Sequence, residues 1–131
     1  MIRSLTLIVL IALTGTFSAC TYDNQEDIGC TGVPESISFS ADVLPIFRSS
    51  CSTVSCHSGV EPTGNLNLEN GVAYEQLTRV GSGYINTDFP NHSKLYTQLN
   101  SLALPMPPAG KLDQCSIDYI LKWIEQGALN N

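Results

Sequence analysis

Two cysteines and a histidine lie close together in the middle of the chain, at Cys51, Cys56 and His57. Two thiols followed at once by an imidazole are typical of covalent haem attachment, in which the thiols bond the porphyrin vinyl groups and the imidazole binds the iron. The usual spacing has two residues between the cysteines, whereas this chain has four. Because the Cys-His end is intact and a longer loop can bulge outward, the pattern still predicts a haem site.

Haem iron has a second axial position, and the sequence offers Met106 for it. Apart from the initiator this is the only methionine, and Pro105 and Pro107 flank it. Prolines on both sides favour an extended, rigid loop that can present a thioether to a metal. A methionine paired with a histidine also raises the reduction potential of the iron. His92 is the alternative ligand, and loop packing is the alternative role of Met106.

Other chemistries of the two cysteines compete with haem binding. Cys51 and Cys56 could close a disulfide, with His57 incidental. A zinc site lacks a convincing fourth ligand, and nucleophilic catalysis by a thiol is poorly supported in an oxidising compartment. A peroxidase-like or gas-sensing haem protein requires an open iron, and hence displacement of Met106. With both axial positions occupied, we expect no enzymatic activity.

The N-terminus has the pattern of an export signal. Arg3 precedes an apolar stretch at 5–13 that is too short to span a bilayer comfortably. The small residues Ser18 and Ala19 before Cys20 resemble a bacterial lipoprotein processing site, in which the cysteine is lipidated. We therefore expect a signal peptide at 1–19 and a lipid-anchored protein of the extracytoplasmic cell envelope. Plain secretion and an uncleaved anchor are the alternatives.

The mature chain is small and acidic. From Cys20 onward there are 112 residues, enough for one domain. They carry 12 acidic and 5 basic side chains, a formal charge of −7, and no basic patch, which argues against a nucleic-acid partner. If Cys20 takes lipid and two cysteines take haem, Cys30 and Cys115 remain. These two could form a disulfide with each other or stay as free thiols.

Periodicity predicts an all-α domain of three to five short helices with long loops, at 41–131, after a polar tether at 20–40. The last five tether residues, 36–40, alternate polar and apolar like a short strand. Four helices are expected. The first starts at Ala41 with Ser40 as its cap, the second covers 71–79, and the third follows Ser93 as its cap. The fourth follows Asp113 as its cap, and its apolar residues recur at helical spacing. Two leucines, Leu66 and Leu68, are expected to reach the core.

From about residue 41 onward the chain resembles small monohaem c-type cytochromes of the planctomycete-type, class-I-like group, over roughly 90 of its 131 residues. The matching segments, in order, are 43–47, 51–57, 64–68, 93–96, 104–108 and 123–128. This resemblance implies one haem c held by Cys51 and Cys56, with His57 as the proximal and Met106 as the distal iron ligand. It also implies that the first and last helices cross, with Phe47 against Trp123 or Ile120.

The function implied is electron transfer with a redox partner protein, by iron that cycles between the ferrous and ferric states. The alternative from another class is a disulfide-stapled surface lipoprotein that binds a partner without haem.

Overall fold

The structure, a computed structural model, describes Cys30 and residues 32–131. Within these residues the chain is helical and holds no strand, which confirms a small all-α fold. Cys20 and the expected signal peptide at 1–19 lie outside the described residues. Among the described helices, none combines the length and the apolar character needed to cross a bilayer.

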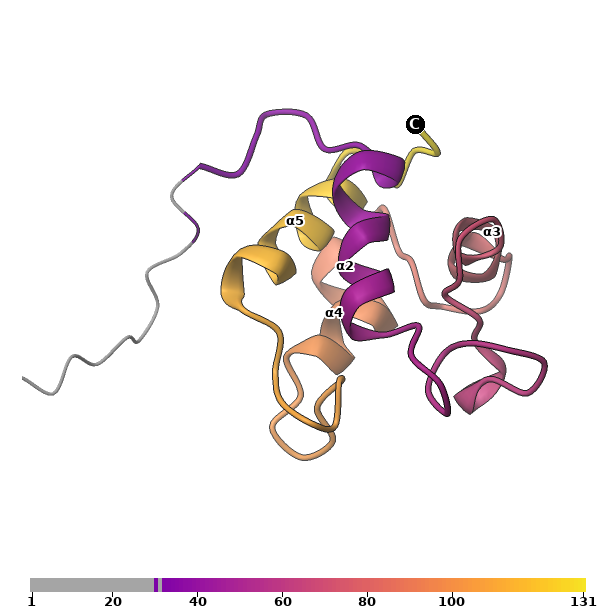
Figure 1. Cartoon of the computed structure of the whole chain (residues 1–131). Coiled ribbons are helices and arrows are strands. Elements are labelled where there is room, and N and C mark those ends of the chain that lie inside the picture. The colour runs from indigo at the N-terminus through magenta and orange to yellow at the C-terminus, as the bar shows by residue number, and fades with distance from the viewer. Residues whose placement is uncertain (1–29, 31) are drawn as a thin grey trace, which may run out of the picture.

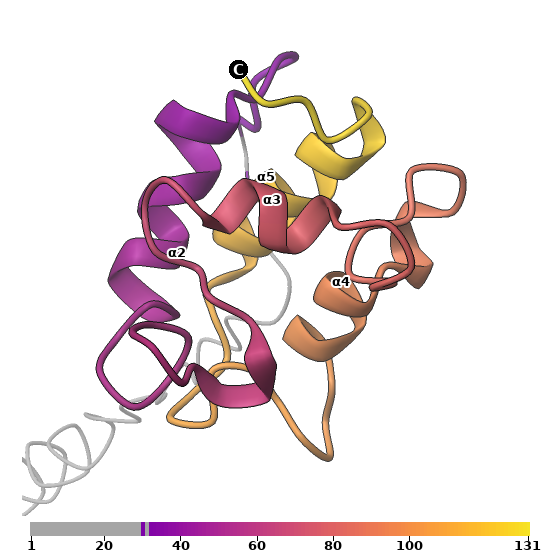
Figure 2. The same cartoon turned by 90° about the vertical axis from the view of Figure 1, so that its right-hand side faces the viewer.

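The helices surround a central core. In Figure 1, α2 lies in front and α4 behind, while α5 and α3 lie to the left and right, and Figure 2 agrees with this arrangement. Long loops join them. The elements in chain order are η1 (Phe39–Val43, a π-helix), α2 (Leu44–Ser50), η2 (Thr63–Asn65, a 3₁₀ turn), α3 (Ala73–Thr78), η3 (Pro90–His92, a 3₁₀ turn), α4 (Lys94–Leu99) and α5 (Gln114–Glu125).

The first helix begins earlier than the sequence predicts. Ser38, not Ser40, is its cap: Ser38 Oγ accepts a hydrogen bond from Ala41 N at 3.2 Å, and Ser38 N donates to Asp42 Oδ2 at 2.7 Å. Pro45, in the first turn of α2, has no N–H, and the turn before it widens so that Val43 N donates to Ser38 O, five residues back. The strand-like interpretation of 36–40 is therefore wrong.

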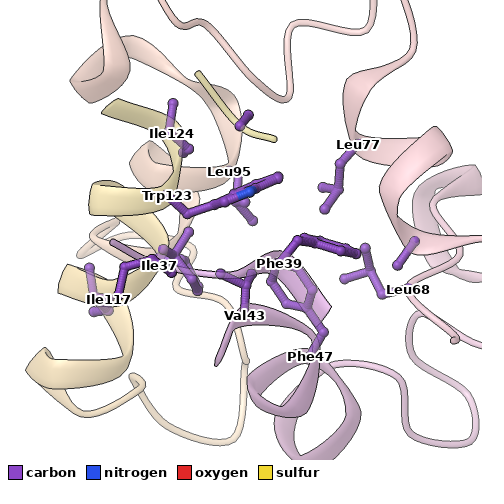
Figure 3. Packing of buried hydrophobic residues seen from close by; sticks show 14 of the residues in the cluster. Ile37, Phe39, Val43, Phe47, Leu68, Leu77, Leu95, Ile117, Trp123 and Ile124 are labelled. Atoms are coloured by element: carbon purple, nitrogen blue, oxygen red, sulfur yellow. The ribbon is translucent and has the colours of Figure 1, made fainter. Parts of the chain in front are cut away.

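The core extends into the segment that the sequence assigns to the tether. Ile37 and Phe39 are 1% and 4% exposed. The ring of Phe39 lies 5.1 Å from that of Trp123 and 6.4 Å from that of Phe47 (Figure 3). Phe39 thus connects the first and last helices. Of the two expected partners of Phe47, Trp123 is not among the ring contacts of the described residues, and Ile120 is buried with Phe47 in the same core cluster.

This placement makes Phe39→Ala a test of the core. Removing a buried aromatic side chain typically costs about 3–5 kcal/mol of unfolding free energy. We expect a loss in that range in urea unfolding, and a change below about 0.5 kcal/mol for Phe89→Ala, because surface substitutions usually have small effects and Phe89 is 63% exposed. Equal, small losses in the two variants would show that Phe39 lies in a tether.

Helix α5 follows its sequence pattern most closely. Asp113 Oδ1 accepts a hydrogen bond from Ser116 N at 2.9 Å, which confirms Asp113 as the cap. Hydrogen bonds from Ser116 hold the pKa of the Asp113 carboxyl below its ordinary value of 3.8. These hydrogen bonds to the ionised carboxylate therefore stabilise the folded protein above pH 3.8, and this stabilisation is lost as the pH falls through the lowered pKa of Asp113. Trp123 is fully buried, with Nε1 donating to Leu129 O at 2.9 Å.

The middle of the chain follows the prediction, except that the predicted cap Ser93 makes no side-chain capping bond. Helix α3 lies within the expected range 71–79, and Leu66 and Leu68 are buried as expected. Ser93 precedes α4 but makes no capping bond. It is fully buried, and its Oγ instead accepts a hydrogen bond from Asn86 N at 2.9 Å, so it ties the preceding loop to the helix.

Candidate haem-attachment site

The loop that begins at Cys51 follows α2 directly. Cys51 N and Ser52 N both donate to Phe47 O at 2.8 Å, which ends the helix. His57 N donates to Cys51 O at 3.1 Å, so the two ends of the loop meet despite the four-residue spacing. Ser55 has a φ of 67°, and Val54 is 89% exposed. The additional residues therefore bulge outward, as the sequence suggests.

The imidazole of His57 is oriented by a backbone carbonyl. Its Nδ1 lies 3.1 Å from Leu66 O. A carbonyl oxygen can only accept, so Nδ1 carries the hydrogen, and the neutral ring then has its lone pair on Nε2. Metal-binding histidines commonly donate their other ring N–H in this way, which fixes the tautomer and the ring orientation. Nε2 is thus the ring nitrogen that the contact with Leu66 O leaves available.

A second segment of the chain, 63–68, holds the Cys56–His57 backbone in place. Thr63 N donates to Cys56 O at 2.7 Å, and Leu68 N donates to His57 O at 2.8 Å. Thr63 Oγ1 also donates to Ser55 O at 3.2 Å. Together with the ring bond to Leu66 O, these contacts fix His57 on both its backbone and its side chain.

Both cysteines of the loop are half-buried free thiols. Cys51 packs against the hydrophobic core. Burial, and secondarily the charge of Cys56, raise the pKa of the Cys51 thiol from 9.0 to about 11. Cys51 is therefore a neutral thiol at neutral pH. Because the unfolded chain loses this proton at lower pH than the folded protein, the free energy of unfolding is unaffected by Cys51 below pH 9 and decreases as the pH rises towards 11.

Met106 lies in the loop between α4 and α5. Its N–H donates to Gln98 O at 3.2 Å, and its side chain is half-buried. Among the described residues it belongs neither to the core nor to the partly buried side chains packed on it. This loop and the one that follows α2 both lie at the lower end of the molecule, opposite the C-terminus (Figures 1 and 2).

No hydrogen bond joins Met106 to His57 in the described part of the chain. His92, the alternative ligand, is exposed on η3, and its ring lies 5.9 Å from that of Phe89. Its surroundings are those of a surface histidine.

A disulfide joins Cys30 and Cys115, whose Cα atoms lie 4.6 Å apart. Cys115 is in the first turn of α5, and Cys30 N donates to Asp118 Oδ2 at 3.3 Å. Of the two possibilities that the cysteine count leaves open, the structure therefore has the disulfide. It ties the segment before the domain to the last helix.

The donor set suits haem c chemically: two free thiols, an imidazole next to them, and a methionine in a loop at the same end of the molecule. By contrast, the described residues contain no cluster of three or more His, Cys, Asp or Glu side chains placed to hold a bare metal ion. A hollow of about 550 Å³ beside Ser52 has a largely polar lining, including Arg48 and Glu69, and none of the candidate ligands lines it.

Comparison with known proteins adds no assignment. The chain matches no protein-family model, no curated protein and no solved structure.

Proposed function

We propose that this chain is an extracytoplasmic, lipid-anchored monohaem c-type cytochrome with a class-I-like fold, and that it transfers electrons to or from a redox partner protein without catalysing a reaction. Cys20 would carry the lipid, Cys51 and Cys56 the thioether bonds, and His57 and Met106 the iron. When bound, haem supplies a one-electron couple between ferrous and ferric iron.

The observation that carries this proposal is the oriented His57. Its Nδ1–H is engaged by Leu66 O at 3.1 Å, and its backbone closes the loop onto Cys51 O at 3.1 Å. An imidazole with one nitrogen fixed and the other free, next to two reduced thiols, is what covalent haem ligation needs. In a surface lipoprotein without haem, His57 would be incidental.

The surface around the candidate ligands gives further support. Residues 51–60 and 100–110 contain no Asp, Glu, Lys or Arg. They also carry four strongly exposed aliphatic side chains, Val54, Val60, Leu102 and Leu104. Exposed apolar side chains on the loops that carry the candidate ligands suit a surface that a ligand or a partner covers. An apolar prosthetic group and an uncharged partner surface both suit this end.

Met106→Ala tests the proposed ligand set. Loss of the thioether should lower the reduction potential of the bound haem by a sizeable part of the ~0.8 V range that axial ligands span. It should also change the reduced absorbance spectrum. Leu104→Ala is the matched control, because Leu104 lies in the same loop, is 73% exposed and has no donor atom. A spectrum and potential shared by Met106→Ala and the unsubstituted protein would remove Met106 from the ligand set.

The Cys30–Cys115 disulfide also bears on the alternative function, a disulfide-stapled binding module. That disulfide suits any small exported domain with a limited core. It therefore supports export equally under either function, and the alternative gives Met106 no role.

A further inference from the structure

The residues between Thr63 and Leu66 adopt an unusual backbone conformation. Gly64 has a φ of 66° and a ψ of 17°, and Asn65 has a φ of 55°. Two successive left-handed residues are uncommon, and asparagine is among the few residues other than glycine that tolerate a positive φ. Pro62 O accepts a hydrogen bond from Asn65 N at 3.0 Å and so closes the turn.

This turn connects one group that bonds to Cys56 and one that bonds to the neighbouring His57 ring. Thr63 N, just before it, donates to Cys56 O at 2.7 Å, and Leu66 O, just after it, lies 3.1 Å from His57 Nδ1. The chain must reverse within two residues to make both contacts. A left-handed pair achieves that reversal, so the conformation of Gly64 and Asn65 determines where Leu66 O lies relative to the imidazole.

We propose that the left-handed turn at Gly64 and Asn65 is a positioning element that sets the hydrogen bond of the His57 ring and, through it, the reduction potential of the bound iron. The inference rests on the proposed function, since it assigns a regulator to the same site. A strong Nδ1–H···O bond makes the imidazole a more basic ligand, which favours ferric iron. A weaker bond therefore raises the reduction potential.

Gly64→Ala isolates this effect. A Cβ at position 64 meets nothing within 4 Å, so the substitution introduces backbone strain without a clash. Gly59→Ala is the matched control: Gly59 lies in the same loop, has a φ of 82°, and its Cβ would also meet nothing. Gly59 bonds to Glu69 and Asn67, not to His57. Both variants should lose some stability, but only the change at Gly64 should alter the iron.

The experiment compares the full-length haem proteins by redox titration and by proton exchange at His57 Nδ1 in D₂O. We expect Gly64→Ala to shift the reduction potential to more positive values and to speed that exchange, with Gly59→Ala indistinguishable from the unsubstituted protein. Asn65→Gly should keep the original potential, because glycine accepts a positive φ, and Asn65→Val should shift it as Gly64→Ala does. If Gly64→Ala does not fold, the comparison of Asn65→Gly with Asn65→Val tests whether the turn sets the reduction potential.

Equal potentials and exchange rates in Gly64→Ala, Asn65→Val and the control would overturn the inference and leave the proposed function intact. If the unsubstituted chain takes up no covalent haem, the proposed function fails, and the inference fails with it.

Discussion

His57→Ala is expected to abolish the spectrum of a six-coordinate c-type cytochrome and most of the stably bound haem. The substitution removes the proposed proximal ligand, and it also removes the ring that bonds to Leu66 O at 3.1 Å. No other histidine of the described residues lies in the loop of Cys51 and Cys56. The measurement is haem content per chain, by absorbance and intact mass, after export together with a cytochrome c maturation system.

His92→Ala is the matched control for that variant, because it removes the other histidine of the chain from an exposed position on η3. We expect it to keep the haem content, spectrum and potential of the unsubstituted protein. A normal spectrum in His57→Ala, or its loss in His92→Ala, would contradict the assignment of His57 as the proximal ligand.

The second large effect is on stability. The Cys30–Cys115 disulfide closes a sequence separation of 85 residues. Removing a native disulfide from a small exported domain typically costs 2–5 kcal/mol, and for a loop of this length the chain-entropy estimate is about 4.5 kcal/mol. We therefore expect the double variant Cys30→Ser/Cys115→Ser to unfold at a much lower urea concentration than the unsubstituted protein in the same haem state.

Treatment with a reducing agent supplies the control for the disulfide. It should destabilise the unsubstituted protein by a similar amount and leave the double variant unchanged. A double variant as stable as the unsubstituted chain would show that these cysteines do not restrain the fold.

Elements with a long periodic pattern could be predicted well from the sequence. Helix α5 has apolar residues at three- and four-residue steps and a capping aspartate, and its bounds follow from these features. The start of the domain could not be predicted as well. Over five residues, the alternation that ends with Phe39 and Ser40 is equally compatible with a strand and with the approach to a helix. Burial of Ile37 and Phe39 against α5 is a non-local contact that decides between them.

In the candidate site, too, some residues could be predicted from the sequence and others could not. Cys51, Cys56 and His57 are recognisable because their side chains and spacing carry the chemistry. The partner of His57 is a backbone carbonyl, which every residue has, so Leu66 leaves no side-chain signal. A glycine followed by an asparagine at 64 and 65 is the one available clue, since both residues favour a left-handed turn. Ser93 does precede α4 as its N-cap, as the sequence predicts, but its side chain bonds to Asn86, seven residues earlier, and this partner could not be predicted from the cap pattern.

The most direct test of the proposed function is the intact mass of the denatured, exported protein, together with its reduced-minus-oxidised absorbance spectrum. We expect one haem retained per chain after denaturation, sharp reduced bands, and no alkylation at Cys51 or Cys56, because both thiols would be in thioether bonds. A chain without haem, lighter by two hydrogens than the form with both thiols free at Cys51 and Cys56, would contradict the account and leave a disulfide-stapled lipoprotein.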